Sequence, residues 1–203
     1  KRKQLFTGLY PEENKLTDTL LINKRPNILI IEWESCGSIF IKSLGGLKNV
    51  TPQFNRLEKE GVFFTNYYSN SFRTDRGTVC AFSGYLGIPT ASIMKIPVKS
   101  QTLSSIAKSL VDVGYKTDFL YGGDIDFTNM RSYLLSNGYQ KITSMENFSF
   151  KEQHSNAWGV NDDITFDWLY NQLLLRKDSL WHTGFLTLSS HEPFKVPYHR
   201  LQD

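Results

Sequence analysis

The 203-residue sequence has no long hydrophobic run and very little cysteine. No stretch of about eighteen apolar residues occurs, so we expect no membrane-spanning helix among these residues, and the start carries no signal-peptide pattern. The two cysteines, Cys36 and Cys80, form neither a CxxC pair nor a metal-binding spacing. The sequence leaves open whether they are joined or free, and buried small apolar residues are the simpler interpretation.

Charge of one sign is also scarce. The formal net charge is +3, and lysine and arginine are scattered among the acidic residues, so we expect no nucleic-acid partner. No internal repeat or low-complexity stretch occurs. The chain does have 40% apolar and 14% aromatic residues, which is enough for one sizeable domain with a packed core.

Near-continuous apolar runs alternate with helix signals along the chain. The run at 25–35 follows a proline and ends in polar residues, as buried strands do. Because the predicted strands are apolar throughout, we expect an α/β fold, a three-layer α/β/α sandwich around a mostly parallel central sheet. The other predicted strands cover 62–69, 116–123 and 182–190, and the predicted helices cover 51–61, 102–115, 127–139 and 161–177.

Polar residues with useful chemistry follow each predicted strand. In parallel α/β sheets, ligands bind beyond the carboxyl ends of the strands, so we expect these residues to meet at one edge of the sheet. They are Glu34 after the first strand, Thr74 after the second, Asp124, Asn129 and Arg131 after the third, and His191 after the last.

These residue types suit attack by a hydroxyl group on a phosphorus or sulfur ester. A divalent cation held by the Glu34 carboxylate would also bind Thr74, lower the pKa of its hydroxyl group and polarise the ester oxygen. Arg131 and His191 would hold the non-bridging oxygens as charge shifts during the reaction. Thr74 precedes an apolar run that could open a helix, and a helix N-terminus would favour an anion there.

Simpler interpretations stand beside these. Thr74 could be an ordinary helix N-cap. Glu32 and Glu34, which alternation places on the same face of a strand, could both be solvent-facing acids at its end, and Glu34 is preferred as the ligand because it is nearer the strand end. His191 could be a loop histidine, and Trp158 could be either a loop anchor or a wall for a substrate headgroup.

Charged residues near these positions also have ordinary interpretations. Arg73 and Arg76 could be paired surface charges rather than substrate contacts. Asp162 or Asp163 is expected to be an acidic residue at the start of the helix predicted for 161–177.

Five segments carry a resemblance to a known family. They are PNILIIEWES, TPQFNRLEKEGVFFTNYYS, RTDRGTVCAFSGYLGIPTASI, YGGDIDFTNM and LTLSSHEPF. In this order they resemble the sulfatase-like branch of the alkaline phosphatase superfamily, most closely the lipoteichoic acid synthase and phosphoglycerol transferase group. The resemblance implies that Glu34 and Thr74 bind one divalent ion (manganese, magnesium or zinc), that Thr74 is the nucleophile, and that His191 binds the substrate phosphate.

The match is looser after the third strand. Tyr121 stands where the family has a histidine, and Thr128 stands where it has a tryptophan. Asp124, Asn129 and Arg131 therefore correspond only loosely to the family's headgroup contacts.

The resemblance also predicts how the chain is divided. Residues 1–24 would be a membrane-proximal lead-in, and residues 25–203 a partial catalytic domain that lacks its C-terminal part. The family completes its metal site with an Asp-His pair that would lie beyond residue 203. We therefore expect weak metal binding and little activity from this chain alone.

The expected function is metal-dependent transfer or hydrolysis of a phosphodiester headgroup, of phosphoglycerol type. The family implies phospholipid or glycan headgroup substrates and a membrane-anchored, extracytoplasmic enzyme. A sulfatase is the nearest competing interpretation. Those enzymes convert a Cys or Ser within C/S-x-P-x-R into the formylglycine that attacks sulfate, whereas this chain has Thr-Asp-Arg-Gly-Thr at that place. The chain could also be a catalytically degenerate binding domain or a purely structural α/β domain, and the structural domain predicts that the strand ends do not meet.

Overall fold

The structure, a computed structural model, describes residue 21 and residues 23–176 and 179–194. Most of the predicted lead-in segment, residues 1–24, lies outside the described residues. Within the described part, no helix is long and apolar enough to cross a membrane. The strands are β1 (Ile28–Glu32), β2 (Lys116–Tyr121), β3 (Lys141–Thr143) and β4 (Trp181–Leu186). The α-helices are α2 (Pro52–Glu60), α3 (Thr74–Ser83), α4 (Pro97–Ser100), α5 (Ile106–Asp112), α6 (Met130–Ser136), α7 (Phe150–Gln153) and α8 (Asp162–Leu174). Short 3-10 helices are η1 (Ser38–Phe40), η2 (Lys42–Leu44), η3 (Ile93–Lys95), η4 (Phe127–Asn129) and η5 (Met145–Asn147).

The four strands form one parallel sheet in the order β1-β4-β2-β3. Leu186, the last residue of β4, is level with Glu32 of β1 and with Tyr121 of β2. The three strands therefore end at the same height, and the residues that follow them meet at one edge. This confirms the predicted α/β fold with a parallel sheet.

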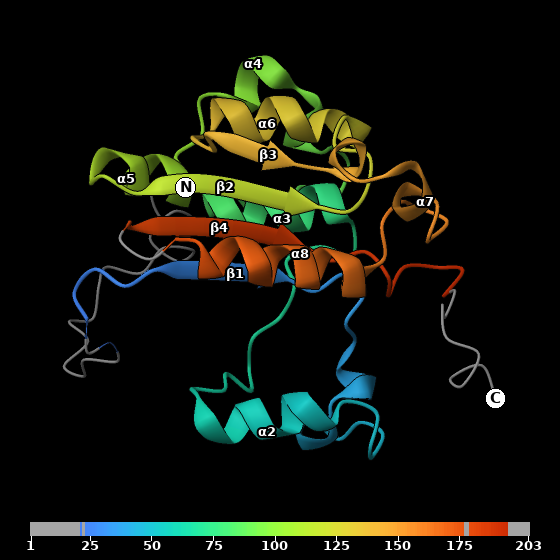
Figure 1. The fold of residues 1–203 in the computed structure, drawn as a ribbon. Coiled ribbons are helices and arrows are strands. Elements are labelled where there is room, and N and C mark those ends of the chain that lie inside the picture. The colour runs from blue at the N-terminus through green and yellow to red at the C-terminus, as the bar shows by residue number, and fades with distance from the viewer. Residues whose placement is uncertain (1–20, 22, 177–178, 195–203) are drawn as a thin grey trace.

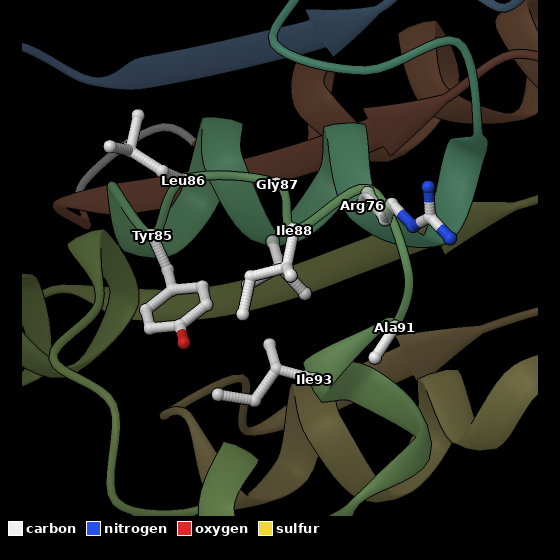
Figure 2. Close-up of a pocket in the computed structure, with 8 residues that line it drawn as sticks. Arg76, Tyr85, Leu86, Gly87, Ile88, Ala91 and Ile93 are labelled. Carbon is white, nitrogen blue, oxygen red and sulfur yellow. The ribbon is translucent and has the colours of Figure 1, made fainter.

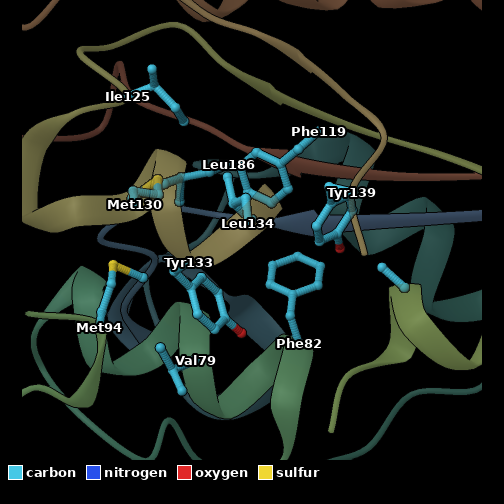
Figure 3. Close-up of a cluster of buried hydrophobic side chains, with 11 residues drawn as sticks. Val79, Phe82, Met94, Phe119, Ile125, Met130, Tyr133, Leu134, Tyr139 and Leu186 are labelled. Carbon is cyan, nitrogen blue, oxygen red and sulfur yellow. The ribbon is translucent and has the colours of Figure 1, made fainter. Parts of the chain in front are cut away.

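Alternating side chains of the central strands pack into two separate hydrophobic cores, one on each face of the sheet. On one face, Phe119 of β2 packs against Phe82 of α3 with ring centroids 5.4 Å apart, and α5 and α6 complete this core (Figure 3). On the other face, Leu120 of β2 packs with Leu169 of α8. Helices therefore cover both faces of the sheet, which is the expected three-layer arrangement (Figure 1).

The segment between β1 and α3 lies apart from these layers. Helix α2 projects away from the sheet beyond β1 (Figure 1). Phe54 of α2 contacts Trp33, which follows β1, and Phe63, with ring centroids 6.2 and 5.8 Å away. β1 itself is less covered than the central strands, because Leu29 and Ile31 remain 38% and 44% exposed.

The strand predicted for residues 62–69 is wrong. These residues return from α2 to α3 without a neighbouring strand, and Tyr67 and Tyr68 are each 80% exposed. A strand needs a partner for its backbone groups, which an aromatic run cannot reveal by itself. The three-residue strand β3 was not predicted, and it pairs with β2 at the far edge of the sheet. Cys36 and Cys80 are both free thiols.

His182, in the middle of the sheet, is completely buried between two polar partners. Its Nδ1 lies 3.2 Å from the carbonyl oxygen of Ile28, and its Nε2 lies 3.0 Å from the hydroxyl oxygen of Tyr139. A carbonyl oxygen can only accept, so Nδ1–H donates to Ile28 and Nε2 accepts from Tyr139. Burial lowers the pKa of His182 below its usual value. The folded protein therefore favours the neutral ring.

We predict that this histidine weakens the fold in acid. Below about pH 6.5 the unfolded chain takes up a proton on His182 more readily than the folded protein does. The free energy of unfolding should therefore fall with pH below that point, by at most about 1.4 kcal/mol per pH unit from this group. Urea unfolding on both sides of about pH 6.5 measures the difference. His182→Gln should reduce it, whereas His154→Gln, at an exposed histidine, should not. An equal pH effect in both variants would contradict the prediction.

Candidate active site

A cavity of about 720 Å³ opens beyond the carboxyl ends of β1, β2 and β4. This volume is typical of sites for small molecules. Its wall is built from the segments that follow these strands, from the start of α3 and from the loop between α7 and α8. Residues of the predicted site that line it are Glu34, Thr74, Asp124 and His191. The purely structural interpretation, which required the strand ends to lie apart, is thereby contradicted.

A second hollow lies under the loop that follows α3 and is much smaller. Its volume is about 10 Å³, room for about one water molecule. Tyr85, Ile88 and Ile93 point into it, while the side chain of Arg76 extends away from them (Figure 2). This hollow is too small for a substrate, so the large cavity is the candidate site.

Glu34 and Thr74 are in direct contact at the floor of the site. The Thr74 hydroxyl group donates a hydrogen bond to Glu34 Oε2, with the two oxygens 2.9 Å apart. The backbone N–H of Glu34 donates to Thr187 Oγ1 at 2.9 Å, which fixes the end of β1 to the segment after β4. Ser35, at a positive φ of 53°, donates from its hydroxyl group to Glu34 Oε1 at 3.0 Å. The carboxylate therefore accepts from Thr74 and Ser35, and the backbone of Glu34 is fixed by Thr187.

Thr74 is not a helix cap. It is the first residue of α3, the cap position is Arg73, and the cap side chain makes no hydrogen bond to the helix. The Thr74 hydroxyl group points instead to Glu34. The N-cap interpretation of Thr74 is wrong, because the helix begins one residue earlier than that interpretation requires.

Glu32, the last residue of β1, precedes Glu34 by two residues and has a different environment. Thr78 of α3 donates to Glu32 Oε2 at 2.8 Å, and a side chain at Gly77 would come within 3.2 Å of Glu32 Oε1. Burial raises the pKa of Glu32 to about 7, with a further increase from the nearby Glu34 and an opposing effect of the Thr78 hydrogen bond. Glu32 is an interior residue that contacts the first turns of α3, and Glu34 is the carboxylate that reaches the cavity.

The residues after β2 divide into two groups. Asp124 lines the cavity, and its Oδ1 accepts from the N–H of Asp126 at 2.9 Å. Arg131 does not line the cavity: its guanidinium group binds Asp126 at 2.8 and 3.0 Å and Glu146 at 2.8 Å. Asn129 does not line it either and has a left-handed backbone with φ of 64°. The structure thus brings neither Asn129 nor Arg131 to the site. The guanidinium group of Arg131 is instead bound by Asp126 and Glu146.

His191 reaches the cavity from a tightly anchored loop after β4. Asp162, the first residue of α8, accepts hydrogen bonds from the N–H groups of Leu188 at 2.7 Å and Ser189 at 2.9 Å. The N–H of Asp162 donates in return to Ser189 Oγ at 2.8 Å. Burial raises the pKa of Asp162, and these N–H groups oppose that shift. Asp162 is the expected helix-start acid, and in addition it fixes the segment that leads to His191.

Trp158 and Tyr121 complete the wall near His191. The ring centroids of Trp158 and His191 are 4.5 Å apart, and Trp158 Nε1 donates to the carbonyl oxygen of Glu192 at 2.6 Å. Trp158 is therefore both a loop anchor and part of the cavity wall, the two interpretations that the sequence left open. Tyr121 also lines the cavity, and its pKa is raised by burial and by the nearby carboxylates of Glu34 and Asp124.

The start of α3 adds two charged residues to the cavity wall: Arg73, which the sequence left open between a paired surface charge and a substrate contact, and Asp75, which sequence reasoning did not assign. Arg73 lines the cavity, as does Asp75, which is only 4% exposed. Arg73 Nε and Lys95 Nζ lie 3.6 and 3.8 Å from the Asp75 carboxylate. No sequence signal distinguishes Asp75, because an acid in the first turn of a helix is ordinary. Arg73 is a cation beside the Thr74 hydroxyl group that could contact an anionic substrate.

The donor set fits part of a site for a hard divalent cation. Two adjacent ligands of an octahedral ion with bonds of about 2.1 Å lie ~3 Å apart, and the oxygens of Glu34 and Thr74 have that spacing. Within the described residues, no group of three or more His, Cys, Asp or Glu side chains is arranged to hold a metal ion. Glu34 and Thr74 could therefore supply two ligands.

Comparison with known proteins places the chain in a family. The model of the sulfatase family matches residues 26–201. Phosphoglycerol transferase I of Xanthomonas campestris pv. campestris (strain B100) is 27% identical over 184 residues, covering 85% of this chain and 26% of that protein. Phosphoglycerol transferase I of Salmonella arizonae is 23% identical, covering 84% of this chain and 24% of that protein. The chain thus spans about a quarter of the length of these curated relatives.

Solved structures show the same fold. A protein of the alkaline phosphatase superfamily from Vibrio parahaemolyticus superimposes with a TM-score of 0.81 and 30% identity, over 89% of this chain and 44% of that one. The lipoteichoic acid synthase LtaP from Listeria monocytogenes superimposes with a TM-score of 0.74 and 16% identity, over 87% of this chain and 46% of that one. These matches confirm the resemblance carried by the sequence motifs. The family model covers most of the chain, and so the chain belongs to the sulfatase family, within the alkaline phosphatase superfamily.

Proposed function

We propose that this chain carries the nucleophile of an enzyme that transfers or hydrolyses a phosphodiester headgroup, with Thr74 as the attacking residue. The observation that carries the proposal is the contact between the Thr74 hydroxyl group and the Glu34 carboxylate at the floor of a substrate-sized cavity. A threonine hydroxyl group is a weak nucleophile unless a base or a metal ion activates it. Here the hydroxyl proton already points at a carboxylate.

Glu34 and Thr74 would hold a divalent ion such as magnesium, manganese or zinc. Such an ion would lower the pKa of the threonine hydroxyl group and polarise a phosphoryl oxygen. The spacing of the two oxygens supports this assignment, and Glu32 does not compete for the role because Thr78 and the start of α3 enclose it. The metal is a proposal that rests on this donor pair.

The chain's own residues suggest a two-step reaction. Thr74 Oγ1 attacks the phosphorus atom and gives up its proton to the Glu34 carboxylate, while the bond from phosphorus to one alcohol breaks and that alcohol leaves with a proton. The other alcohol stays on the phosphorus atom, so the intermediate is a phosphodiester of Thr74. An acceptor alcohol or water then attacks the phosphorus atom and releases Thr74 Oγ1. Arg73 and His191 also line the cavity, where they would bind the non-bridging oxygens. The first N–H groups of α3 add a further preference for an anion.

Sulfate ester hydrolysis is the weaker candidate. The sulfatase mechanism needs an aldehyde made from cysteine or serine, whereas Thr74 occupies the nucleophile position and its Cβ carries a methyl group that cannot give an aldehyde. The relatives named phosphoglycerol transferase I agree with a phosphorus ester. A lipid or glycan headgroup and an extracytoplasmic location belong to the same proposal; one structural neighbour is the periplasmic domain of EcEptC from Escherichia coli, with a TM-score of 0.60 and 17% identity.

The first test replaces the nucleophile. In the full-length protein, Thr74→Ala should lower turnover of a chromogenic phosphodiester at least ~10³-fold, because the substitution removes the attacking oxygen. The free energy of unfolding should change by only about 1–2 kcal/mol, the size of one lost hydrogen bond. Thr74→Ser keeps the hydroxyl group and should keep measurable turnover. A phosphoryl group that still carries its second alcohol, found on residue 74 by mass spectrometry, would support the covalent step, whereas unchanged turnover in Thr74→Ala would exclude it.

The second test asks which of two carboxylates binds the metal ion, Glu32 at the end of β1 or Glu34 just after it. Glu34→Gln should abolish the dependence of turnover on added Mn²⁺ by removing a negatively charged ligand. Glu32→Gln is a matched control on the same face of the strand; it keeps the hydrogen bond from Thr78 and should leave the metal dependence in place. Titrating each variant with Mn²⁺ while following phosphodiester turnover gives the comparison. The same Mn²⁺ response in both variants would reject Glu34 as the ligand.

A further inference from the structure

The carbonyl oxygen of Glu192 lies between two side chains of the cavity wall. It is 2.6 Å from Trp158 Nε1 and 2.9 Å from His191 Nδ1. A carbonyl oxygen has two lone pairs and can only accept hydrogen bonds. Both ring nitrogens must therefore carry a proton. The indole nitrogen always does, and the contact selects the Nδ1–H form of His191.

This selection leaves one nitrogen of His191 for chemistry. With Nδ1–H donating to Glu192, Nε2 is the remaining polar atom of the ring. Nε2 accepts a proton when the ring is neutral and donates one when the ring is an imidazolium. The hydrogen bond at one nitrogen of a histidine thus sets what the other nitrogen can do.

Trp158 is in turn held firmly in place. Its backbone N–H donates to Asn156 Oδ1 at 3.2 Å, and Asn156 Nδ2 donates to Asn161 Oδ1 at 3.0 Å. Asn156 is only 9% exposed, and Gly159 makes bridges to both Asn156 and Gly123. The indole ring lies against the imidazole ring with centroids 4.5 Å apart. An anchored loop therefore presents this ring to His191, and a ring in that position restricts rotation of the imidazole.

We propose that Trp158 is a positioning residue that fixes His191 as the Nδ1–H tautomer, through ring contact and the shared carbonyl of Glu192, so that Nε2 faces the reacting phosphoryl group. The proposal rests on the proposed function for the purpose of this arrangement, and on geometry alone for the tautomer. Asp162 fixes the backbone of Leu188 and Ser189 just before His191.

The tautomer is measured without any substrate. Long-range proton–nitrogen NMR spectra of the ¹⁵N-histidine-labelled protein distinguish Nδ1–H from Nε2–H rings. His182 provides an internal standard, since its Nδ1 contacts the Ile28 carbonyl and its Nε2 accepts from Tyr139, remote from Trp158. We expect Nδ1–H signals from both His182 and His191. An Nε2–H ring at His191 would overturn the proposal.

Variants of Trp158 test the cause. Trp158→Phe keeps a ring against His191 and should largely keep the tautomer, whereas Trp158→Ala should give a mixture of tautomers at His191 with His182 unchanged. Trp181→Phe is the control, because Trp181 lies at the opposite end of β4 from the cavity. A His191 ring that stays fully Nδ1–H in Trp158→Ala would remove Trp158 from the role.

Kinetics then connect the tautomer to the reaction. In the full-length protein, Trp158→Ala should lower kcat for a phosphodiester about 10-fold or more, the usual effect of losing a group that orients a functional histidine, with a smaller change in KM. Trp158→Phe should recover most of this loss, and Trp181→Phe should behave as wild type. Equal losses in Trp158→Ala and Trp158→Phe would overturn the role of the ring. A wild type with the expected tautomer but no phosphodiester turnover would reject the proposed function and leave the positioning of His191 by Trp158 supported.

Discussion

The hydrogen bond from Thr74 to Glu34 joins the two elements on which the site depends. The residues are 40 positions apart in the chain, and the bond forms only when the end of β1 and the first turn of α3 lie side by side. The second contact of Glu34, its N–H to Thr187 Oγ1, adds the end of β4. The floor of the cavity therefore results from two strands that end at one level of a parallel sheet and from the helix that begins beside them.

The same strand and its end provide two acids with different properties. Glu32 and Glu34 share a face, yet burial raises the pKa of Glu32 to about 7 while Glu34 faces the cavity. Both acids accept a hydrogen bond from α3, the inner one from Thr78 and the outer one from Thr74. Because Thr74 and Thr78 are four residues apart, they lie on one face of the helix. The spacing of the two threonines along one turn of α3 thus matches the spacing of the two glutamates that they contact.

The sequence predicted the parts that depend on local pattern. The apolar runs at β1, β2 and β4 could be recognised, because strands of a parallel sheet read as near-continuous apolar runs, although Leu29 and Ile31 of β1 stay partly exposed. Glu34 could be placed at the end of β1, whereas Thr74 could be recognised only from its position before a helix, since the strand predicted ahead of it does not form. Residues 62–69 have a similar composition but no neighbouring strand, and nothing in the run itself reveals that. Arg131 had the right chemistry for a substrate anion, but its partners Asp126 and Glu146 were invisible, since Glu146 is fifteen positions away. Side-chain pairing across loops is a tertiary property.

The wall and the floor of the cavity are held by different contacts. Tyr121 and Thr128, the two positions where the family resemblance is loosest, both line the cavity, and so does Trp158 from a different loop. The contacts that hold Thr74 and Glu34 come from Ser35 and Thr187 and from each other, so exchanges in the wall leave the reacting atoms undisturbed. Different side chains in the wall do change the surface that a headgroup meets, which can be a hydroxyl group or the flat face of an indole ring. Under the proposed function, the sheet ends therefore determine the reaction, and the loops after β2 and before α8 determine which headgroup enters.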